Sequence, residues 1–282
     1  MNTTHPSGNE QARLWNGSGG QTWVEAQALL DRMFKPLEDL LAATIDAGTA
    51  SDILDVGCGT GSTTLAAARR LEDPRRAMGI DLSGPMIAAA RLRAERDGIP
   101  AAFVQADAQR HAFTPDSVDT IVSRFGVMFF DNAVEAFTNL RRAARAGADL
   151  RFVAWRSAAE NSFMTAAERA AARLVPGIAP RKDGEPGQFA FADRDVVAGI
   201  LAGSGWSGID IAPLDVTCTL PEQELTEYLT RLGPLGRALF EEDQATRARV
   251  IAAVRPAFDT YQHGGEIRFT AACWTVAARN GR

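Results

Sequence analysis

The chain of 282 residues has little cysteine, and its three cysteines are Cys58, Cys218 and Cys273. Three scattered cysteines make neither a disulfide framework nor the paired spacing of a zinc site, which favours a reducing compartment. The chain also lacks an uninterrupted apolar run of about 18 residues, and its first residues contain no apolar signal core. We therefore expect a cytoplasmic protein that is not exported and does not cross a membrane.

Basic residues are in the minority as well. The chain holds 30 Lys and Arg against 35 Asp and Glu, which gives a net charge of -5. Non-specific binding to a phosphate backbone needs a basic face, so we expect no nucleic-acid partner. An apolar content of 46% is typical of a globular protein long enough for one large domain. The sequence leaves a homodimer open as the one protein partner.

What the chain does have is a glycine loop between a short apolar strand and a helix. Three glycines stand at alternate positions of the segment DILDVGCGTGSTTLAAA, residues 52–68: Gly57, Gly59 and Gly61. Glycine permits a positive φ and a closer approach of a ligand than a Cβ allows, and the following helix N-terminus can receive an anion. The dinucleotide fingerprint wants another glycine at position 62, which is Ser. The nearby charge of Asp55 suits a positive amine better than a pyrophosphate.

Two further acidic residues end predicted strands. The apolar strand over 76–80 runs into Asp81, which lies 20 residues beyond Gly61 and can accept hydrogen bonds from both hydroxyls of a ribose. The strand over 101–106 runs into Asp107. A strand-end Asp by itself is more often a cap or a turn residue. Because parallel strands present their carboxyl ends at one sheet edge, the joint spacing favours a nucleoside-binding site there.

With these motifs, the chain resembles the class I S-adenosylmethionine-dependent methyltransferases over residues 10–155, and it is most similar to the small-molecule enzymes that include those of quinone biosynthesis. The resemblance implies S-adenosylmethionine as the cofactor, with the loop of residues 55–61 on the methionine portion, Asp81 on the ribose and Asp107 on the adenine amine. The cofactor-binding residues that it implies are Trp15, Asp55, Gly57, Cys58, Gly59, Gly61, Asp81, Leu82, Met86, Asp107, Ala108, Ser123 and Arg124.

The resemblance also implies a doubly wound, Rossmann-like α/β fold with a seven-stranded sheet, mostly parallel with an antiparallel last strand, plus a helical cap. Strand and helix patterns alternate from residue 52 to 155, which predicts right-handed crossovers, with the fourth strand over 117–130. We expect residues 1–20 to be mobile up to Trp15. We expect a single domain over 1–282, with a helical lid over 1–50, a cofactor-binding core over 51–156 and cap insertions over 157–192 and 221–262.

The sequence indicates the cofactor better than the reaction. Methyl transfer from a sulfonium is an in-line displacement that works by alignment and desolvation, so it requires no motif for a base. Aromatic faces can stabilise the sulfonium charge. The predicted walls of the acceptor site are Trp23, Phe125, Phe129 and Trp155, with core packing as the alternative for Phe129. No catalytic residue is assigned, and the candidates are Arg124, Tyr261 and His263. Arg124 could instead form a structural ion pair.

The ends of the fourth and fifth strands offer no oxygen cluster for Mg²⁺, so we expect no metal. The function that the sequence favours is methyl transfer from S-adenosylmethionine to the oxygen, nitrogen or carbon of a small molecule. Two alternatives stay open, because a glycine loop indicates binding and not turnover. One is an enzyme of the same fold that uses the cofactor for cyclisation or aminopropyl transfer. The other is a noncatalytic or regulatory S-adenosylmethionine-binding protein.

Overall fold

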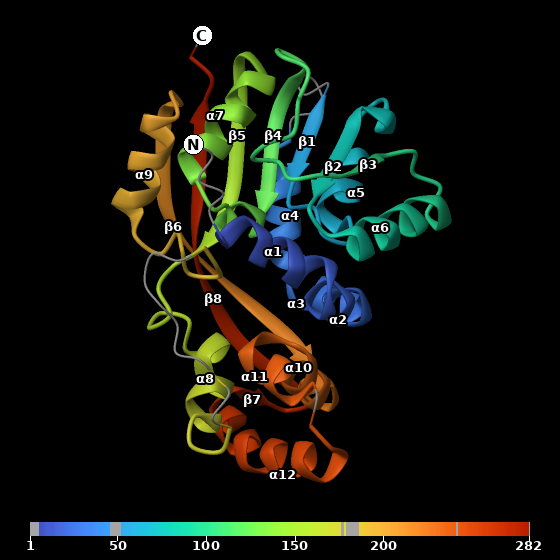
Figure 1. Ribbon diagram of the computed structural model, residues 1–282, viewed down its shortest axis with the longest axis vertical. Coiled ribbons are helices and arrows are strands. Elements are labelled where there is room, and N and C mark those ends of the chain that lie inside the picture. Colours follow the sequence, from blue (N-terminus) through green and yellow to red (C-terminus); the bar gives the residue numbers. More distant parts are fainter. Residues whose placement is uncertain (1–5, 46–51, 176–177, 179–185, 241, 282) are drawn as a thin grey trace.

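The computed structural model describes residues 6–45, 52–175, 178, 186–240 and 242–281. Its centre is a sheet with the strand order β3-β2-β1-β4-β5-β8-β6, and the short β7 pairs with β8 (Figure 1). Neighbouring strands are parallel from β3 to β5, whereas β8 is antiparallel to both β5 and β6. The predicted mostly parallel sheet with an antiparallel last strand is confirmed. The strands span Ile53–Val56 (β1), Ala77–Asp81 (β2), Ala102–Gln105 (β3), Val118–Arg124 (β4), Ala144–Trp155 (β5), Ser207–Pro221 (β6), Gln262–His263 (β7) and Glu266–Arg279 (β8).

Helices cover both faces of this sheet. The chain moves from β1 to β3 toward one edge and from β4 to β5 toward the other, so right-handed crossovers place the connecting helices on opposite faces. Helices α4 and α5 contact each other and the central strands, while α7 contacts β5 and α9. These helices span Lys35–Ala43 (α4), Ser62–Ala68 (α5), Gly84–Arg96 (α6), Ala133–Ala143 (α7) and Arg194–Gly203 (α9).

The paired strands β6 and β8 extend beyond the rest of the sheet and carry a helical cap at their far end (Figure 1). Residues 221–262, predicted as a helical stretch, form most of this cap. Its elements are α8 (Ser162–Ala171), η3 (Glu222–Glu224), α10 (Leu225–Arg231), α11 (Gly233–Leu239), α12 (Gln244–Val254) and η4 (Arg255–Tyr261). Hereafter the cap means these elements together with the ends of β6 and β8 that carry them.

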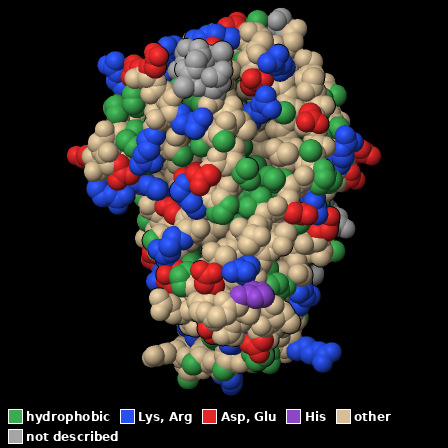
Figure 2. Space-filling view, turned by 180° about the vertical axis from the view of Figure 1, so that it is seen from behind, with side chains coloured by type: hydrophobic (Ala, Val, Ile, Leu, Met, Phe, Trp, Pro, Cys, Tyr) green, Lys and Arg blue, Asp and Glu red, His purple; other side chains and the backbone are tan. Residues whose placement is uncertain are grey.

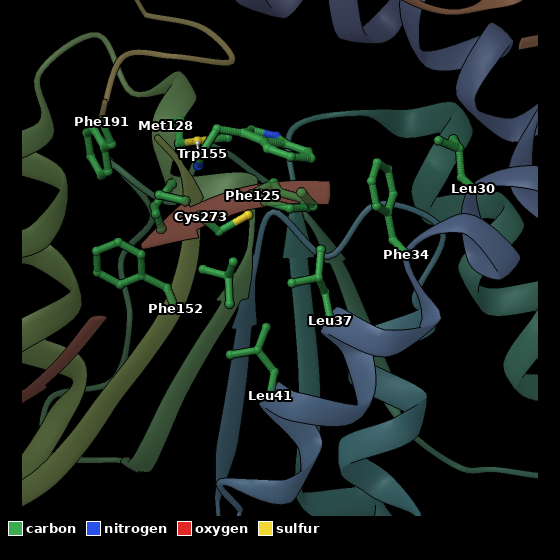
Figure 3. Packing of buried hydrophobic residues seen from close by; sticks show 14 of the residues in the cluster. Leu30, Phe34, Leu37, Leu41, Phe125, Met128, Phe152, Trp155, Phe191 and Cys273 are labelled. Carbon is green, nitrogen blue, oxygen red and sulfur yellow. Dashed lines mark hydrogen bonds between the residues drawn. The ribbon is translucent and has the colours of Figure 1, made fainter. Parts of the chain in front are cut away.

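One hydrophobic cluster runs from the N-terminal helices through the sheet into the cap. It includes Leu37 of α4, Phe125 and Trp155 at the ends of β4 and β5, and Phe258 of the cap. Figure 3 shows Phe34 and Leu37 on the helical side of this cluster, next to Phe125. Because burial of apolar side chains is the main favourable term in folding, the shared cluster joins the cap firmly to the sheet.

The N-terminal segment forms α1 (Pro6–Asn16), α2 (Ser18–Glu25) and α3 (Gln27–Met33), and the end of α1 docks on the connection between β2 and α6. The helices expected in residues 1–50 are thus present where the structure describes them, and the mobility expected up to Trp15 stays a prediction. One local expectation was wrong. The fourth strand does not continue to residue 130. It ends at Arg124, since Phe125 adopts a φ of 67° and Gly126–Phe129 forms a 3₁₀ turn, η2.

The apolar character of the helices and the charge of the surface are relevant to membrane and nucleic-acid partners. Within the part of the chain that the structure describes, no helix has the length and apolar character needed to span a bilayer. On the face drawn in Figure 2, basic and acidic side chains are interspersed, so this face carries no continuous basic surface. The expected absence of a nucleic-acid partner stays a prediction.

Candidate active site

The glycine loop after β1 is clamped between the ends of β2 and β4. The amides of Gly57 and Cys58 both donate to the carbonyl of Ile80, at 2.9 and 3.1 Å. Gly57 has a φ of 66°, and a Cβ on it would lie 2.5 Å from the Cα of Gly126. Gly59 also has a positive φ but is not crowded by other backbone. The first glycine is therefore required by the packing of two loops, and Gly59 presents its backbone to the space above them.

Asp81 is tied to this loop at the end of β2. Its Oδ2 accepts the amide of Gly59 and its Oδ1 accepts the amide of Ser83, both at 2.8 Å. Burial raises the pKa of Asp81 above its usual value, and hydrogen bonds from the backbone of Ser83, Gly59 and Leu82 oppose that rise. An ionised carboxylate has about four acceptor positions. The two backbone bonds thus fix the carboxylate plane and leave acceptor positions for the hydroxyls of a ligand.

The next strand end contributes Asp107, whose Oδ1 accepts the amide of Gln109 at 2.9 Å and so closes a tight turn. Met86 reaches the same space from the first turn of α6. That helix begins after Ser83, whose hydroxyl accepts the amide of Met86 at 3.4 Å, with proline in the first turn. The N-cap residue Ser83 and the proline fix the start of α6 and thereby the position of Met86.

Asp55 lies beneath the loop and not in the open space. It is 1% exposed, its Oδ2 accepts the hydroxyl of Thr64 at 2.7 Å, and its Oδ1 has no hydrogen-bond partner among the described residues. Burial raises the pKa of Asp55 to about 7. A buried carboxylate with one unpaired oxygen favours the neutral form until a positive charge comes near.

Arg124 ends β4 and precedes by two residues Gly126, which packs on Gly57 of the glycine loop. Its guanidinium donates to Ser62 Oγ at 2.7 Å and to the carbonyl of Phe34 at 3.4 Å. Burial lowers the pKa of Arg124 from its usual value. None of the described carboxylates lies within 4.0 Å of it, so the structural ion pair that was one of the two sequence interpretations has no partner here.

An aromatic wall stands beside the loop. Phe125 and Trp155 stack with ring centroids 4.4 Å apart and planes 4° apart, and Phe34 meets them edge-on at 5.5 and 5.8 Å. The positive φ of Phe125 is costly for a residue with a Cβ, and such strain persists only where the surroundings enforce it. The strained backbone turns this ring toward Trp155.

A second aromatic group, Trp15, Trp23 and Phe129, joins the N-terminal helices to η2. Trp15 lies 5.8 Å from Trp23 and 5.3 Å from Phe129, edge-on to both. Edge-on aromatic pairs add roughly 0.5–1.5 kcal/mol beyond the area that they bury. The three rings thus hold α1 and α2 against the turn that follows β4.

Asn16 fastens the same helices to the Asp81 segment. Its Oδ1 accepts the amide of Gly84 at 2.9 Å and Nε2 of Gln105 at 3.1 Å, and its Nδ2 donates to the carbonyl of Leu82 at 3.1 Å. In addition, Ser83 Oγ donates to the carbonyl of Trp15 at 2.6 Å. The last residue of α1 is therefore hydrogen-bonded to the backbone on either side of Ser83.

Most of these residues border one cavity of about 1310 Å³. The predicted site residues that line it are Trp15, Trp23, Gly57, Cys58, Gly59, Asp81, Leu82, Met86, Asp107, Ala108, Arg124, Phe125, Phe129 and Trp155. Asp55, Gly61 and Ser123 do not line it. Gly61 is packed against Phe103, and Ser123 Oγ donates to the carbonyl of Val56 at 2.7 Å. These three residues support the loop, and the geometry gives them no direct contact with the cavity.

The cavity also has walls that sequence reasoning missed. It is lined by Thr60 of the loop, Thr63 of α5, Phe34 before α4, and Tyr228 and Arg247 of the cap. The two threonines lie inside the recognised motif and could have been included. The other three come from segments distant in sequence, and no local pattern marks them.

The remaining candidates for catalysis lie elsewhere. Tyr261 accepts or donates a hydrogen bond with Ser162 Oγ at 2.8 Å and packs on Phe163, and neither Tyr261 nor His263 lines the cavity. Their predicted catalytic roles gain no support from the geometry. The described residues contain no cluster of three or more His, Cys, Asp or Glu that could hold a metal ion.

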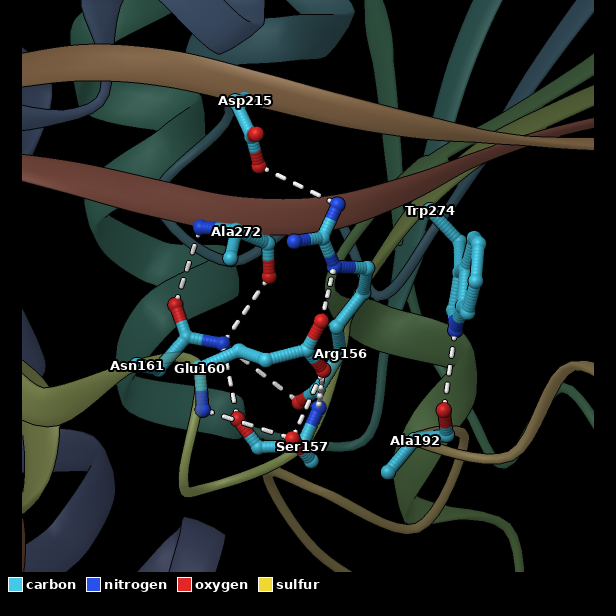
Figure 4. A network of polar contacts seen from close by, with 8 residues as sticks. All are labelled: Arg156, Ser157, Glu160, Asn161, Ala192, Asp215, Ala272 and Trp274. Carbon is cyan, nitrogen blue, oxygen red and sulfur yellow. Dashed lines mark hydrogen bonds and ion pairs between the residues drawn. The ribbon is translucent and has the colours of Figure 1, made fainter.

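A polar network anchors the cap where β5 ends (Figure 4). Arg156 pairs with Glu160 at 3.0 Å and with Asp215 of β6 at 3.1 Å, and its guanidinium lies over the ring of Trp274 at 5.7 Å. Asn161 bridges the same turn to the backbone of Ala272 through two hydrogen bonds of 2.9 and 3.0 Å. The network fixes the direction in which the β6/β8 pair leaves the sheet, and hence the distance between the cap and the loop.

A family model matches the segment of the chain that carries this site. Residues 53–147 match the family model of a methyltransferase domain. This segment carries the glycine loop, Asp81 and Asp107 on a sheet of the order described above. Over these residues the chain matches the methyltransferase-domain family, whose cofactor is S-adenosylmethionine.

Individual relatives are more distant. The chain is 28% identical over 127 residues to an uncharacterized protein of Mycobacterium tuberculosis, a match that covers 45% of each chain. It is 27% identical over 110 residues to the demethylmenaquinone methyltransferase of Lactiplantibacillus plantarum, covering 38% of this chain and 46% of that one. The matched part is thus less than half the length of either relative. The solved geranyl diphosphate C-methyltransferase of Streptomyces coelicolor shares the fold at 16% identity, with a TM-score of 0.55 and coverage of 98% and 99%.

Proposed function

We propose that the protein transfers a methyl group from S-adenosylmethionine to a small-molecule acceptor by in-line displacement. The observation that carries the proposal is the single cavity, which runs from the strand ends at Asp81 and Asp107 to the cap. At about 1310 Å³ it exceeds the roughly 300–1,000 Å³ of a pocket for one ligand. It therefore has room for a cofactor and an acceptor together.

The cofactor is proposed to lie along the carboxyl edge of β1 to β3. Asp81 would accept the ribose hydroxyls, with Asp107 and Ala108 at the adenine and the loop from Gly57 to Thr60 beside the methionine portion. A sulfonium and an amine are positive charges, and Asp55 with its unpaired oxygen lies just below this loop. The charge of the cofactor would help to ionise that carboxylate.

The acceptor is proposed to lie between the wall of Phe34, Phe125 and Trp155 and the cap. The protein's own contribution to the reaction is alignment and the exclusion of water by these rings and by the N-terminal helices. Two of the relatives are named for small molecules, demethylmenaquinone and geranyl diphosphate, which supports an acceptor of that size. In this proposal the chain is a single domain, in which residues 1–50 act as a lid and residues 157–192 and 221–262 are the cap insertions. The three free cysteines support a cytoplasmic location.

The direct test is calorimetry with S-adenosylmethionine, S-adenosylhomocysteine and NAD in turn. We expect micromolar binding of the two sulfur nucleotides and none of NAD. Formation of S-adenosylhomocysteine with a panel of small acceptors, followed by mass spectrometry, then tests transfer. Binding of NAD without binding of either sulfur nucleotide would refute the proposal.

A further inference from the structure

Charged residues line the cavity both at the strand ends and in the cap. Its lining residues up to Trp155 include six acidic residues and one basic residue: Glu10, Glu25, Asp31, Asp81, Asp107, Asp131 and Arg124. Beyond Trp155 the described lining residues include one acidic residue, Asp193, and three basic ones, Arg231, Arg237 and Arg247. Asp193 is the N-cap residue of α9, where its Oδ1 accepts the amides of Asp195 and Val196. Among the described residues, the cap itself contributes three basic residues and no acidic one to the lining, and Glu25 of α2 pairs with one of them, Arg231.

Arg247 brings a positive charge to the half of the cavity under the cap, and nearby carboxylates do not neutralise it. It lies in the first turn of α12 and donates from Nε to the carbonyl of Leu239 at 2.9 Å and from Nη2 to the carbonyl of Phe240. These two carbonyls end α11, so they hold the guanidinium at the cavity wall. Among the described residues no carboxylate lies within 4.0 Å of Arg247, whereas Arg231 is paired with Glu25 and Glu227.

Apolar side chains surround this charge. Phe240, next to the carbonyl that Arg247 holds, lines the cavity and is 57% exposed, which is unusual for so large an apolar side chain. Leu232, Tyr228 and Met164 line the same half. An apolar lining with a few fixed polar groups is the usual composition of a site that orients a ligand by one charged end.

We propose that the acceptor is an amphipathic anion, with an apolar ring or chain body against these side chains and a carboxylate, sulfonate or phosphate group at Arg247. The guanidinium has five N–H donors, of which the two carbonyls take two. The remaining donors suit the oxygens of an anion. Asp81 and Asp107, which line the cofactor end, would repel the same group, so the molecule enters with its anionic end toward the cap and its apolar end toward the cofactor. This inference rests on the proposed function, because it concerns the acceptor half of the same cavity.

The test uses two fluorescent probes that share a ring system. Anilinonaphthalene sulfonate carries an anionic group, and N-phenylnaphthylamine is its neutral counterpart. Both are titrated into the full chain saturated with S-adenosylhomocysteine. In Arg247→Gln we expect the Kd of the sulfonate to rise about tenfold or more, since a hydrogen bond to an ionised group is lost. The Kd of the neutral probe should stay within about twofold.

Two variants make the result specific. Arg249→Gln removes the same charge from the same helix at an exposed position that does not line the cavity, and it should change neither Kd. Arg247→Lys keeps the charge without the planar fork and should lie between the parent and Arg247→Gln. Retained binding of the neutral probe shows that the cap is still folded.

The inference is overturned if Arg247→Gln leaves the sulfonate titration unchanged, or if it weakens both probes equally. Calorimetry with S-adenosylhomocysteine on the same samples separates this failure from failure of the proposed function. A protein that binds the nucleotide but does not distinguish the probes refutes only the anionic acceptor. A protein that does not bind the nucleotide refutes the proposed function.

Discussion

The two halves of the cavity are built by different means. In the cofactor half, the position of each group follows from backbone hydrogen bonds at strand ends, as in the contacts of Asp81 with the amides of Gly59 and Ser83. In the half under the cap, long side chains of short helices form the wall, and Arg247 is held by carbonyls at the end of another helix. Strand ends in a shared sheet have little conformational freedom, so the cofactor half suits a ligand that is always the same, such as a cofactor. The second half is free to vary with the acceptor.

The largest effect expected from this comparison is in Asp81→Ala, which should weaken binding of S-adenosylhomocysteine about tenfold to a thousandfold. The variant removes the acceptor of two hydrogen bonds to an ionised group, each worth roughly 1.5–3 kcal/mol. Calorimetry measures the loss, and Asp81→Asn should lose less because it keeps one carbonyl acceptor. Binding of N-phenylnaphthylamine in the other half should not change. If Asp81→Ala instead melts early and still binds the nucleotide normally, Asp81 is only a loop support.

Asp55→Asn should make the ligand-free protein more stable at pH 8, by as much as about 4 kcal/mol for a rise of about three pKa units. The pKa of Asp55 in the folded protein is raised to about 7 from its usual 3.8. Between these values the folded state binds more protons than the unfolded state, so the carboxylate lowers the free energy of unfolding as pH rises, and the cost is complete above pH 7.

The measurement is the difference in free energy of unfolding between Asp55→Asn and the parent, taken from pH 4 to pH 8. It should be near its minimum at pH 4 and grow until about pH 7. Taking the difference cancels the titration of groups that both proteins share. A difference that is constant over this range would show that Asp55 is ionised in the ligand-free fold. The same variant should bind the cofactor more weakly, because the amide carries no charge.

Asn16→Ala should weaken S-adenosylhomocysteine about threefold to tenfold. The substitution removes the hydrogen bonds to the backbone of Leu82 and Gly84 that hold α1 over the Asp81 segment, each worth roughly 0.5–1.5 kcal/mol net. Calorimetry again provides the readout. Arg13→Ala on the same helix, at an exposed position away from the cavity, is the matched control and should bind normally. Equal affinities of both variants would mean that α1 does not act as a lid on the cofactor.

The smallest effect is a difference between two substitutions of one residue. Phe125→Ala and Phe125→Gly both remove the aromatic ring, but only glycine adopts a φ of 67° without strain. We expect Phe125→Gly to be the more stable of the two by about 1 kcal/mol, because the left-handed conformation costs a residue with a Cβ roughly 1–2 kcal/mol. Urea denaturation measures the order. The opposite order would show that the turn after β4 relaxes once the ring is removed.

Much of the cofactor half was predictable from consecutive residues. The strand that ends at Asp81, the glycine loop and the helix that starts at Ser62 each depend on a short segment with its own periodicity and turn residues. Even there the interpretation was incomplete, because Gly61 and Ser123 pack against protein and not against the cavity. Which glycine serves a ligand and which serves packing depends on loops that come together only in the fold.

The amino-acid sequence alone determined the type of sheet, the order of its elements and the carboxylates at the ends of β2 and β3, because those features depend on neighbours along the chain. Only the tertiary structure decided that Asn16 locks onto Leu82, that Phe34 meets Phe125 and Trp155, and that Arg247 brings charge to the same cavity. The physical reason is the distance along the chain between these partners. Contacts of that kind are selected by the packing of whole helices and by the direction of the β6/β8 pair, which no local pattern encodes.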